Sequence, residues 1–478
     1  MTAPANFQFS IFNFHFNKWY EASEYSLLTI CAIALPIQWR IALWCLVLLC
    51  INTLIKIIAT RRIFNPALNR PIRSCLYLMV IYYLLYAVSR IYSSQPTATA
   101  STISTMLPLL LFPLVFLLGD TTYLQRRHLS SITFLFAATL TLRFVIMLLR
   151  SALHYADSQL YTSTTGAFAS ILVWASSLFT QATPLPCAHD PLVFLPIRAV
   201  AHLFHNTPFE HLPPYQFDPL HHNYLSLYIL TAIALLYTET VHHWQSPRWR
   251  KTRWFIVADI AFLSAYILLS DSRSGIVAWV LLASACLIHI ATKLRQWRPI
   301  AIILATATIL IGLTYWATPK TYKRITDTAQ NLLSGQRGDV RQSLWQSGLE
   351  AVKERPLFGY GCDGYWDALF AQYRAHDCLD ANIKKFSTHN QYLETTLATG
   401  VVGLMVMLAM ILLPVLLAFR RPHRNLPMFL FTVVYATCIF FEAAFGRQMG
   451  LLFISFGYCL LLLYSSPTCT PKKGLMKN

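Results

Sequence analysis

The sequence predicts an all-α polytopic membrane protein, and two observations carry that prediction. Hydrophobic residues make up 56% of the 478 positions and charged residues only 12%, which is more apolar than a soluble domain of this length can bury. Apolar runs long enough to cross a roughly 30 Å hydrocarbon layer as helices recur along the chain. About twelve such spans are predicted, near residues 24–38, 40–59, 74–92, 104–119, 129–149, 222–241, 254–270, 275–291, 299–316, 394–419, 427–445 and 448–465.

The orientation of these spans follows from the loops between them, because short loops rich in Lys and Arg stay in the cytoplasm. With the N-terminus inside, alternate loops carry most of the basic residues, and the formal net charge of +18 is mainly a signal of topology. Nucleic acid is therefore not expected as a partner. The predicted cytoplasmic loops lie near residues 56–73, 126–127, 248–253, 293–298 and 420–424.

This topology divides the chain into five segments. Residues 1–149 hold the first five spans, residues 222–316 the next four, and residues 394–478 the last three with a cytoplasmic tail. Two large segments remain on the outer side. Residues 150–221 contain apolar pieces broken by prolines, which predict helices lying on the membrane surface, and residues 317–393 form a polar loop domain with charges of both signs.

The sequence gives little indication of disulfides and none of a metal site. Most of the 11 cysteines lie inside apolar runs, where a thiol behaves as a small hydrophobic group. Cys362 and Cys378 lie in the polar outer segment, where an oxidising compartment would permit a disulfide between them. His, Cys, Asp and Glu residues do not show metal-ligand spacing, so we expect neither a metal nor another cofactor.

The stretch "KKFSTHNQYLETTLATGVVGL" marks the change from the polar outer segment to an apolar span. Thr388 and Gln391 have the spacing of a capping box, which predicts Thr388 as the N-cap and His389 as the first helical residue. The helix dipole would keep His389 neutral, the form from which a general base starts. The alternative is a polar histidine that only marks the start of a helix. Gly400 and Gly403 are expected to let another helix approach closely.

Several outer motifs together resemble one family. His389, ten residues and then Gly400 resemble the H-x10-G signature of the O-antigen ligase family, which also includes O-antigen polymerases and bacterial O-linked oligosaccharyltransferases. "ERPLFGYGCDGYW" resembles its Pro-x-x-Gly-x-Gly turn, preceded by a helix with Arg341. "LLSDSRSG" resembles its Ser-Arg-Gly turn at Arg273, with Ser274 inserted, and "DPLHHNYLSLY" resembles a segment with a histidine and a tyrosine, here His221 and Tyr224.

The resemblance implies transfer of a glycan from an undecaprenyl diphosphate carrier to an acceptor hydroxyl, at the outer, periplasmic face of the bacterial inner membrane. His389 would be the catalytic base. Arg273 and Arg341 would neutralise the diphosphate without a metal, because a guanidinium holds phosphate oxygens bidentately. As structural alternatives, Arg273 would extend to the membrane surface and Arg341 would join a surface ion pair.

Further candidates for substrate binding are Asn390, His221, Tyr224, Glu442 and Arg447. Glu442 and Arg447 fall at the outer turn between the last two spans, where an acidic group is costly unless it is paired or functional. The simplest alternative is that these two residues bind each other.

Three functions remain open from the sequence. The first is an O-antigen ligase that joins a polymerised glycan to the lipid A-core acceptor. The second is a relative with other substrates, either a polymerase of carrier-linked repeat units or an oligosaccharyltransferase that acts on protein. The third is a transporter, which is disfavoured because the polar candidates cluster in outer loops and not on broken helices at mid-membrane. Membrane lipids surround the protein in each case.

Overall fold

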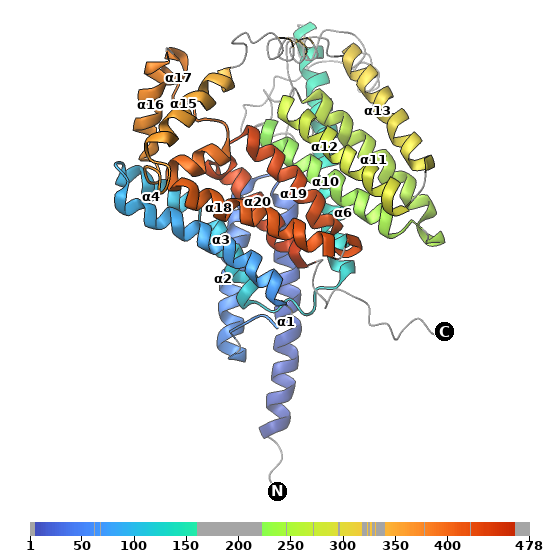
Figure 1. Ribbon diagram of the computed structural model, residues 1–478. Helices are drawn as coiled ribbons and strands as arrows, with labels where there is room; N and C mark the ends of the chain where they lie inside the picture. The colour runs from blue at the N-terminus through green and yellow to red at the C-terminus, as the bar shows by residue number, and fades with distance from the viewer. Residues whose placement is uncertain are drawn as a thin grey trace.

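The computed structural model describes residues 5–159, 222–317 and 340–463, apart from a few positions within these ranges. Its elements are helical throughout the described ranges, which confirms the all-α class. His221 and nearly all of the predicted outer segment 150–221 lie outside the described residues. Figure 1 shows the helices gathered into one bundle, with the short helices α15, α16 and α17 at one edge.

The N-terminal part contains six α-helices. Each apolar run predicted for this part overlaps one of them. The first helix begins well before the predicted span because the residues from Ala5 to Ala34 include neither Pro nor Gly. The helices are α1 (Ala5–Ala34), α2 (Trp39–Thr60), α3 (Arg70–Ser89), α4 (Pro96–Thr105), α5 (Pro108–Leu118) and α6 (Arg126–Gln159).

The remaining predicted spans also overlap helices. Four of the helices that overlap spans precede the polar loop domain and three follow it. Three further short helices form the described part of that domain. They are α10 (His222–His242), α11 (Arg250–Leu269), α12 (Arg273–His289), α13 (Trp297–Ala317), α15 (Val340–Glu354), α16 (Tyr365–Ala375), α17 (Leu379–Ile383), α18 (Gln391–Arg420), α19 (Pro422–Phe441) and α20 (Gln448–Leu462).

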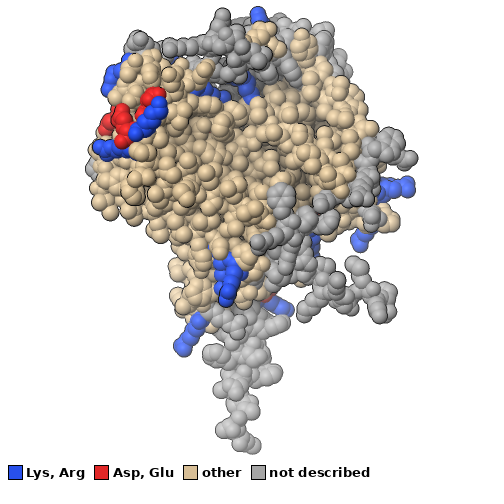
Figure 2. Space-filling model, viewed as in Figure 1, with Lys and Arg blue, Asp and Glu red and all other residues tan. Residues whose placement is uncertain are grey.

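Length and composition allow eight helical stretches among the described residues to cross a membrane, and three shorter apolar helices accompany them. Large apolar side chains on their outer faces are exposed, including Trp44, Ile58 and Phe255, as expected for groups in contact with lipid chains. Figure 2 shows a broad area almost without Lys, Arg, Asp or Glu across the middle of the visible face. The described chain is therefore built as a polytopic membrane protein.

α10 lies at the centre of the bundle, because nearly all of its side chains are buried against α6, α11, α12 and α19. Its first residues contact α19 and α12 through Asn223. Near its last turn, Glu239 lies 3.6 Å from both Arg126 and His243. The two ends of α10 thus define two ends of the bundle. The end where α10, α12, α18 and α20 begin is called the site end below.

Cys362 and Cys378 are not joined by a disulfide. Cys362 is buried and its Sγ lies 3.6 Å from a carboxylate oxygen of Asp363, whereas the Sγ of Cys378 lies 3.6 Å from the carbonyl of His376. The structure therefore lacks the disulfide between Cys362 and Cys378 that the sequence permitted.

Candidate active site

His389 lies in the loop that leads into α18, and its backbone has a φ of 49°. α18 begins at Gln391, and the side chain of Asn390 accepts a hydrogen bond of 3.1 Å from the Leu393 N–H. Asn390 is therefore the N-cap. The predictions that Thr388 is the N-cap and that His389 is the first helical residue are wrong. The sequence allows either cap, because Asn and Thr both satisfy the first free N–H groups of a helix.

Thr388 instead anchors the loop. It is fully buried, its hydroxyl donates to the Asn390 carbonyl at 3.2 Å, and its own carbonyl accepts from Trp345 Nε1 at 2.9 Å. Trp345 belongs to α15, so the polar loop domain holds the backbone beside His389. The Ser387 hydroxyl also accepts from the His389 N–H at 3.2 Å. These bonds fix a left-handed conformation that is uncommon for residues other than glycine.

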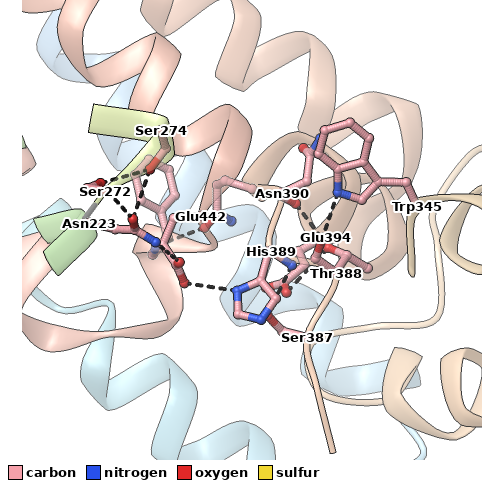
Figure 3. Close-up of polar contacts among 12 residues, drawn as sticks. Asn223, Ser272, Ser274, Trp345, Ser387, Thr388, His389, Asn390, Glu394 and Glu442 are labelled. Carbon is pink, nitrogen blue, oxygen red and sulfur yellow. Dashed lines mark hydrogen bonds and ion pairs between the residues drawn. The ribbon is translucent and has the colours of Figure 1, made fainter. Parts of the chain in front are cut away.

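A chain of hydrogen bonds connects His389 with three other segments at the site end (Figure 3). Nδ1 of His389 lies 3.4 Å from Oε1 of Glu442, and Oε2 of Glu442 accepts from the Asn223 amide at 2.6 Å. The Asn223 side-chain oxygen accepts from Ser274 at 2.8 Å and from Ser272 at 3.2 Å. We call these five residues the polar chain. It joins the starts of α10 and α12 and the end of α19 to the loop before α18.

The polar chain determines which nitrogen of His389 is free to act. A carboxylate only accepts hydrogen bonds, so a neutral His389 carries its proton on Nδ1 and keeps a lone pair on Nε2. The side chain of His389 is 32% exposed, whereas that of Glu442 is 12% exposed. A substrate can therefore reach the imidazole, while the carboxylate that orients the ring is largely screened from solvent.

Both candidate arginines lie next to residues of this arrangement. Arg273 is the first residue of α12, between Ser272 and Ser274 of the polar chain. Arg341 precedes Trp345 by four residues on α15, and side chains with that spacing share one helix face. Both side chains are half-buried. Arg273 thus neighbours the polar chain in sequence, and Arg341 lies one helical turn from the residue that contacts the His389 loop.

The other candidates for substrate binding that the structure describes lie outside the polar chain. Tyr224 is buried and packs against α20, where a Cβ on Gly450 would lie 2.8 Å from its ring. Arg447 is exposed directly before α20, five residues after Glu442. Asn390 is buried and acts as the cap of α18.

Gly400 is the point where α18 breaks, with φ 69° and ψ −167° inside the helix. The outer turn that contains Gly359 fills the break. Tyr360 and Gly361 donate their N–H groups to the carbonyls of Leu397 and Ala398 at 2.8 and 2.9 Å. Val401 donates to the Pro356 carbonyl at 2.8 Å. These bonds replace helical bonds that the break removes, so the turn and the broken helix form one unit.

The expectation that Gly400 admits another helix is therefore wrong. A Cβ on Gly400 would lie 2.0 Å from the Leu357 carbonyl oxygen, and one on Gly359 would lie 2.4 Å from the Leu397 oxygen. Gly403 lies one turn after the break, where a Cβ would meet the Thr399 hydroxyl of the same helix. The glycines of the two motifs are needed because two backbones meet at this point.

Comparison with known proteins shows that residues 259–408 match the model of the O-antigen ligase family. This stretch is therefore similar to O-antigen ligases. The matched range includes Arg273, Arg341, His389 and Gly400, whereas Asn223 and Glu442 lie outside it.

Two known proteins are similar to parts of the chain. An uncharacterized protein of Haemophilus influenzae is 27% identical over 186 residues, which cover 37% of this chain and 46% of the relative. The exopolysaccharide production protein ExoQ of Rhizobium meliloti is 35% identical over 74 residues, which cover 15% of this chain and 17% of ExoQ. The chain therefore spans less than half of the length of either relative.

Two polar residues near the candidate site, Asn223 and Glu394, were not predicted from the sequence. Asn223 is a lone amide at the start of an apolar helix, and Glu394 is an acidic residue in the first turn of α18. Glu394 is buried, with its oxygens 3.5 Å from the hydroxyls of Thr388 and Tyr365. Burial, reinforced by the nearby Glu394 carboxyl, raises the pKa of Tyr365 well above its ordinary value. A polar side chain inside an apolar run is the signal that could have identified both.

Proposed function

We propose that this protein transfers a glycan from an undecaprenyl diphosphate carrier to an acceptor hydroxyl, as an O-antigen ligase that acts on the lipid A-core. The observation that carries the proposal is the hydrogen-bonded pair of His389 and Glu442. A histidine oriented through Nδ1 by a screened carboxylate presents a basic Nε2, the arrangement of a general base. The acceptor in this proposal is a sugar hydroxyl, which needs such a base.

The reaction follows from these positions. Nε2 of His389 removes the proton of the acceptor hydroxyl while the oxygen attacks the anomeric carbon of the carrier-linked glycan. The bond from that carbon to the diphosphate oxygen breaks, and the diphosphate leaves with the electron pair. Glu442 stabilises the imidazolium that forms, since the two groups then carry opposite charges. The imidazolium later returns its proton to solvent.

The leaving diphosphate needs positive charge, because negative charge accumulates on its oxygens in the transition state. Arg273 lies between Ser272 and Ser274 of the polar chain, and Arg341 lies one helical turn before Trp345, which contacts the His389 loop. A guanidinium stays protonated and can hold two phosphate oxygens at once. We assign these two arginines to the diphosphate and expect no metal requirement.

The site is proposed to face the periplasm from the inner membrane. The basic loops after α2 and α10 lie at the end of the bundle away from His389, where Lys56 contacts the Leu118 carbonyl and Arg253 contacts the Trp244 carbonyl. By the positive-inside rule, that end is cytoplasmic. The carrier glycan would then meet the acceptor on the outer leaflet.

A polymerase is the second candidate, and the similarity to an exopolysaccharide production protein favours it. A polymerase would use the same base and arginines, with the end of another carrier-linked glycan as the acceptor. The residues that contact His389 do not distinguish the two acceptors.

Analysis of lipopolysaccharide from a deletion strain separates these functions. A ligase predicts the loss of all glycan-capped bands on a gel and accumulation of long glycan on the carrier, restored by the wild-type gene but not by His389→Ala. A polymerase predicts a single repeat on the core. Normal capped lipopolysaccharide together with unchanged carrier-linked glycan would contradict both.

A further inference from the structure

A cavity of about 420 Å³ lies between α10, α11, α12 and α13, away from the polar chain. These helices lie side by side in Figure 1. Each one contributes residues of a single face. On α11 they include Arg253, Val257, Ile260 and Ser264, which are separated by three or four positions.

Polar groups along the wall of the cavity, both near the mouth and in the deep part, have partners of their own. The Tyr237 hydroxyl lies 2.9 Å from Nδ1 of His289, and Trp279 Nε1 donates to Ser264 at 3.1 Å. Ser264 in turn donates to the Ile260 carbonyl at 2.7 Å. The other lining residues below the mouth are mostly aliphatic. Apolar cavities do not hold water well but do accept apolar ligands, so a hydrocarbon chain is the matching occupant.

The length of the cavity corresponds to one leaflet of a bilayer. Its lining on α11 extends from Arg250 to Ser264, a rise of about 21 Å at 1.5 Å per residue. Half of a bilayer including its headgroups is also about 20–22 Å. A phospholipid acyl chain fits this length, whereas the much longer undecaprenyl chain of a carrier does not.

The mouth of the cavity carries positive charge and aromatic rings. Arg250 and Arg253 lie in the first turn of α11, beside Trp244 and Trp254. The Arg253 guanidinium contacts the Trp244 carbonyl and lies 5.1 Å from the centre of its ring. This mouth is at the end of the bundle opposite His389. Basic groups with Trp at such a boundary suit the headgroup of an anionic lipid.

We propose that this cavity binds one acyl chain of an anionic phospholipid, whose phosphate contacts Arg250 and Arg253. The bound lipid fills the space between α11 and α13 and holds these helices against α10 and α12. The site is separate from the proposed transfer reaction and does not depend on it.

Native mass spectrometry of the purified full-length protein tests the charge at the mouth. With added phosphatidylglycerol, we expect one tightly bound lipid per chain, and weaker binding of phosphatidylcholine. Arg250→Gln should weaken phosphatidylglycerol binding about fivefold, the effect of one basic residue near a lipid surface. Arg248→Gln is the matched control, because Arg248 is exposed in the same loop but does not line the cavity. Equal binding of both lipids, or no effect of Arg250→Gln, would overturn the proposal.

A second pair of variants tests the cavity itself. Ala261→Trp places a large side chain inside it and should abolish tight lipid binding, whereas Ala258→Trp on the exposed face of α11 should not. Unchanged binding in a folded Ala261→Trp protein would show that the lipid lies elsewhere. Co-purification of undecaprenyl carrier in this position, displaced by Ala261→Trp, would also reject a phospholipid occupant.

Discussion

Replacing Gly400 with alanine should separate the outer turn from the broken helix α18. The φ and ψ of Gly400 fall in a region that is nearly restricted to glycine, and another residue there costs about 1–3 kcal/mol. An added Cβ would also lie 2.0 Å from the Leu357 oxygen and 2.4 Å from the Phe358 nitrogen. Both are backbone atoms and cannot rotate away, so the turn must move.

The free-energy cost of Gly400→Ala follows from the hydrogen bonds that this movement breaks. Three backbone hydrogen bonds join the turn to α18, at 2.8, 2.9 and 2.8 Å, and each contributes about 1 kcal/mol net. Together with the backbone conformation, Gly400→Ala should cost about 4–6 kcal/mol in the free energy of docking. The purified variant should therefore unfold at a lower temperature in detergent.

Maleimide labelling of Cys362 reports on the same movement. Cys362 is 1% exposed beside Gly361, and its N–H donates to the Ser89 hydroxyl at 2.9 Å. Burial and the neighbouring Asp363 raise the pKa of its thiol, so the folded protein should label slowly at this position. Gly400→Ala should label faster, with Cys362→Ser identifying the labelled site.

Gly312→Ala is the control for this experiment, because an added Cβ there meets nothing within 4 Å. It should leave the unfolding temperature and the labelling rate unchanged. A Gly400→Ala protein with wild-type stability and an unlabelled Cys362 would refute the account of the break.

Three further predictions concern the proposed reaction. Arg273→Lys and Arg341→Lys should leave partial transfer of glycan by the purified protein, whereas alanine at either position should leave little, because lysine keeps the charge but loses the bidentate fork; equal activity of the lysine and alanine variants would argue against diphosphate binding. Transfer should persist in excess EDTA, and loss of activity that magnesium or manganese restores would remove the two arginines from their assigned role. Trp345→Phe removes the 2.9 Å bond to the Thr388 carbonyl, about 1 kcal/mol, and should reduce kcat without preventing membrane insertion; an unchanged kcat would show that this bond does not position His389.

The sequence predicts the helices well because hydropathy is local information. Each of the twelve predicted spans overlaps a described helix, and the boundaries differ by a few residues for most of them. The largest difference is at α1, where aromatic and polar residues continue the helix toward the N-terminus without contributing to an apolar run. Hydropathy detects spans, not the helices that extend beyond them.

The site is predicted only in part. The order of the motifs predicts that His389 and the two arginines act at one site, and this stays a prediction, although Arg273 lies between two residues of the polar chain. The polar chain beyond His389 could not be predicted, because His389 and Glu442 are 53 positions apart and Glu442 and Asn223 are 219 positions apart. The second contact depends on the packing of α10 against α19. The backbone at His389 and the break at Gly400 are also set by tertiary bonds, from Trp345 and from the outer turn.

The role of His389 as a base is tested most directly by measuring donor binding and glycan transfer on the same purified His389→Gln protein. If His389 is the base, this protein should retain the undecaprenyl diphosphate glycan nearly normally and lose transfer by a factor of about 10² to 10⁴, the usual contribution of a general base. Glu442→Gln, which keeps a hydrogen bond to Nδ1 but removes the charge, should give an intermediate rate. Near-wild-type transfer by a well-inserted His389→Gln protein would contradict the account, because glutamine cannot accept the proton of the acceptor.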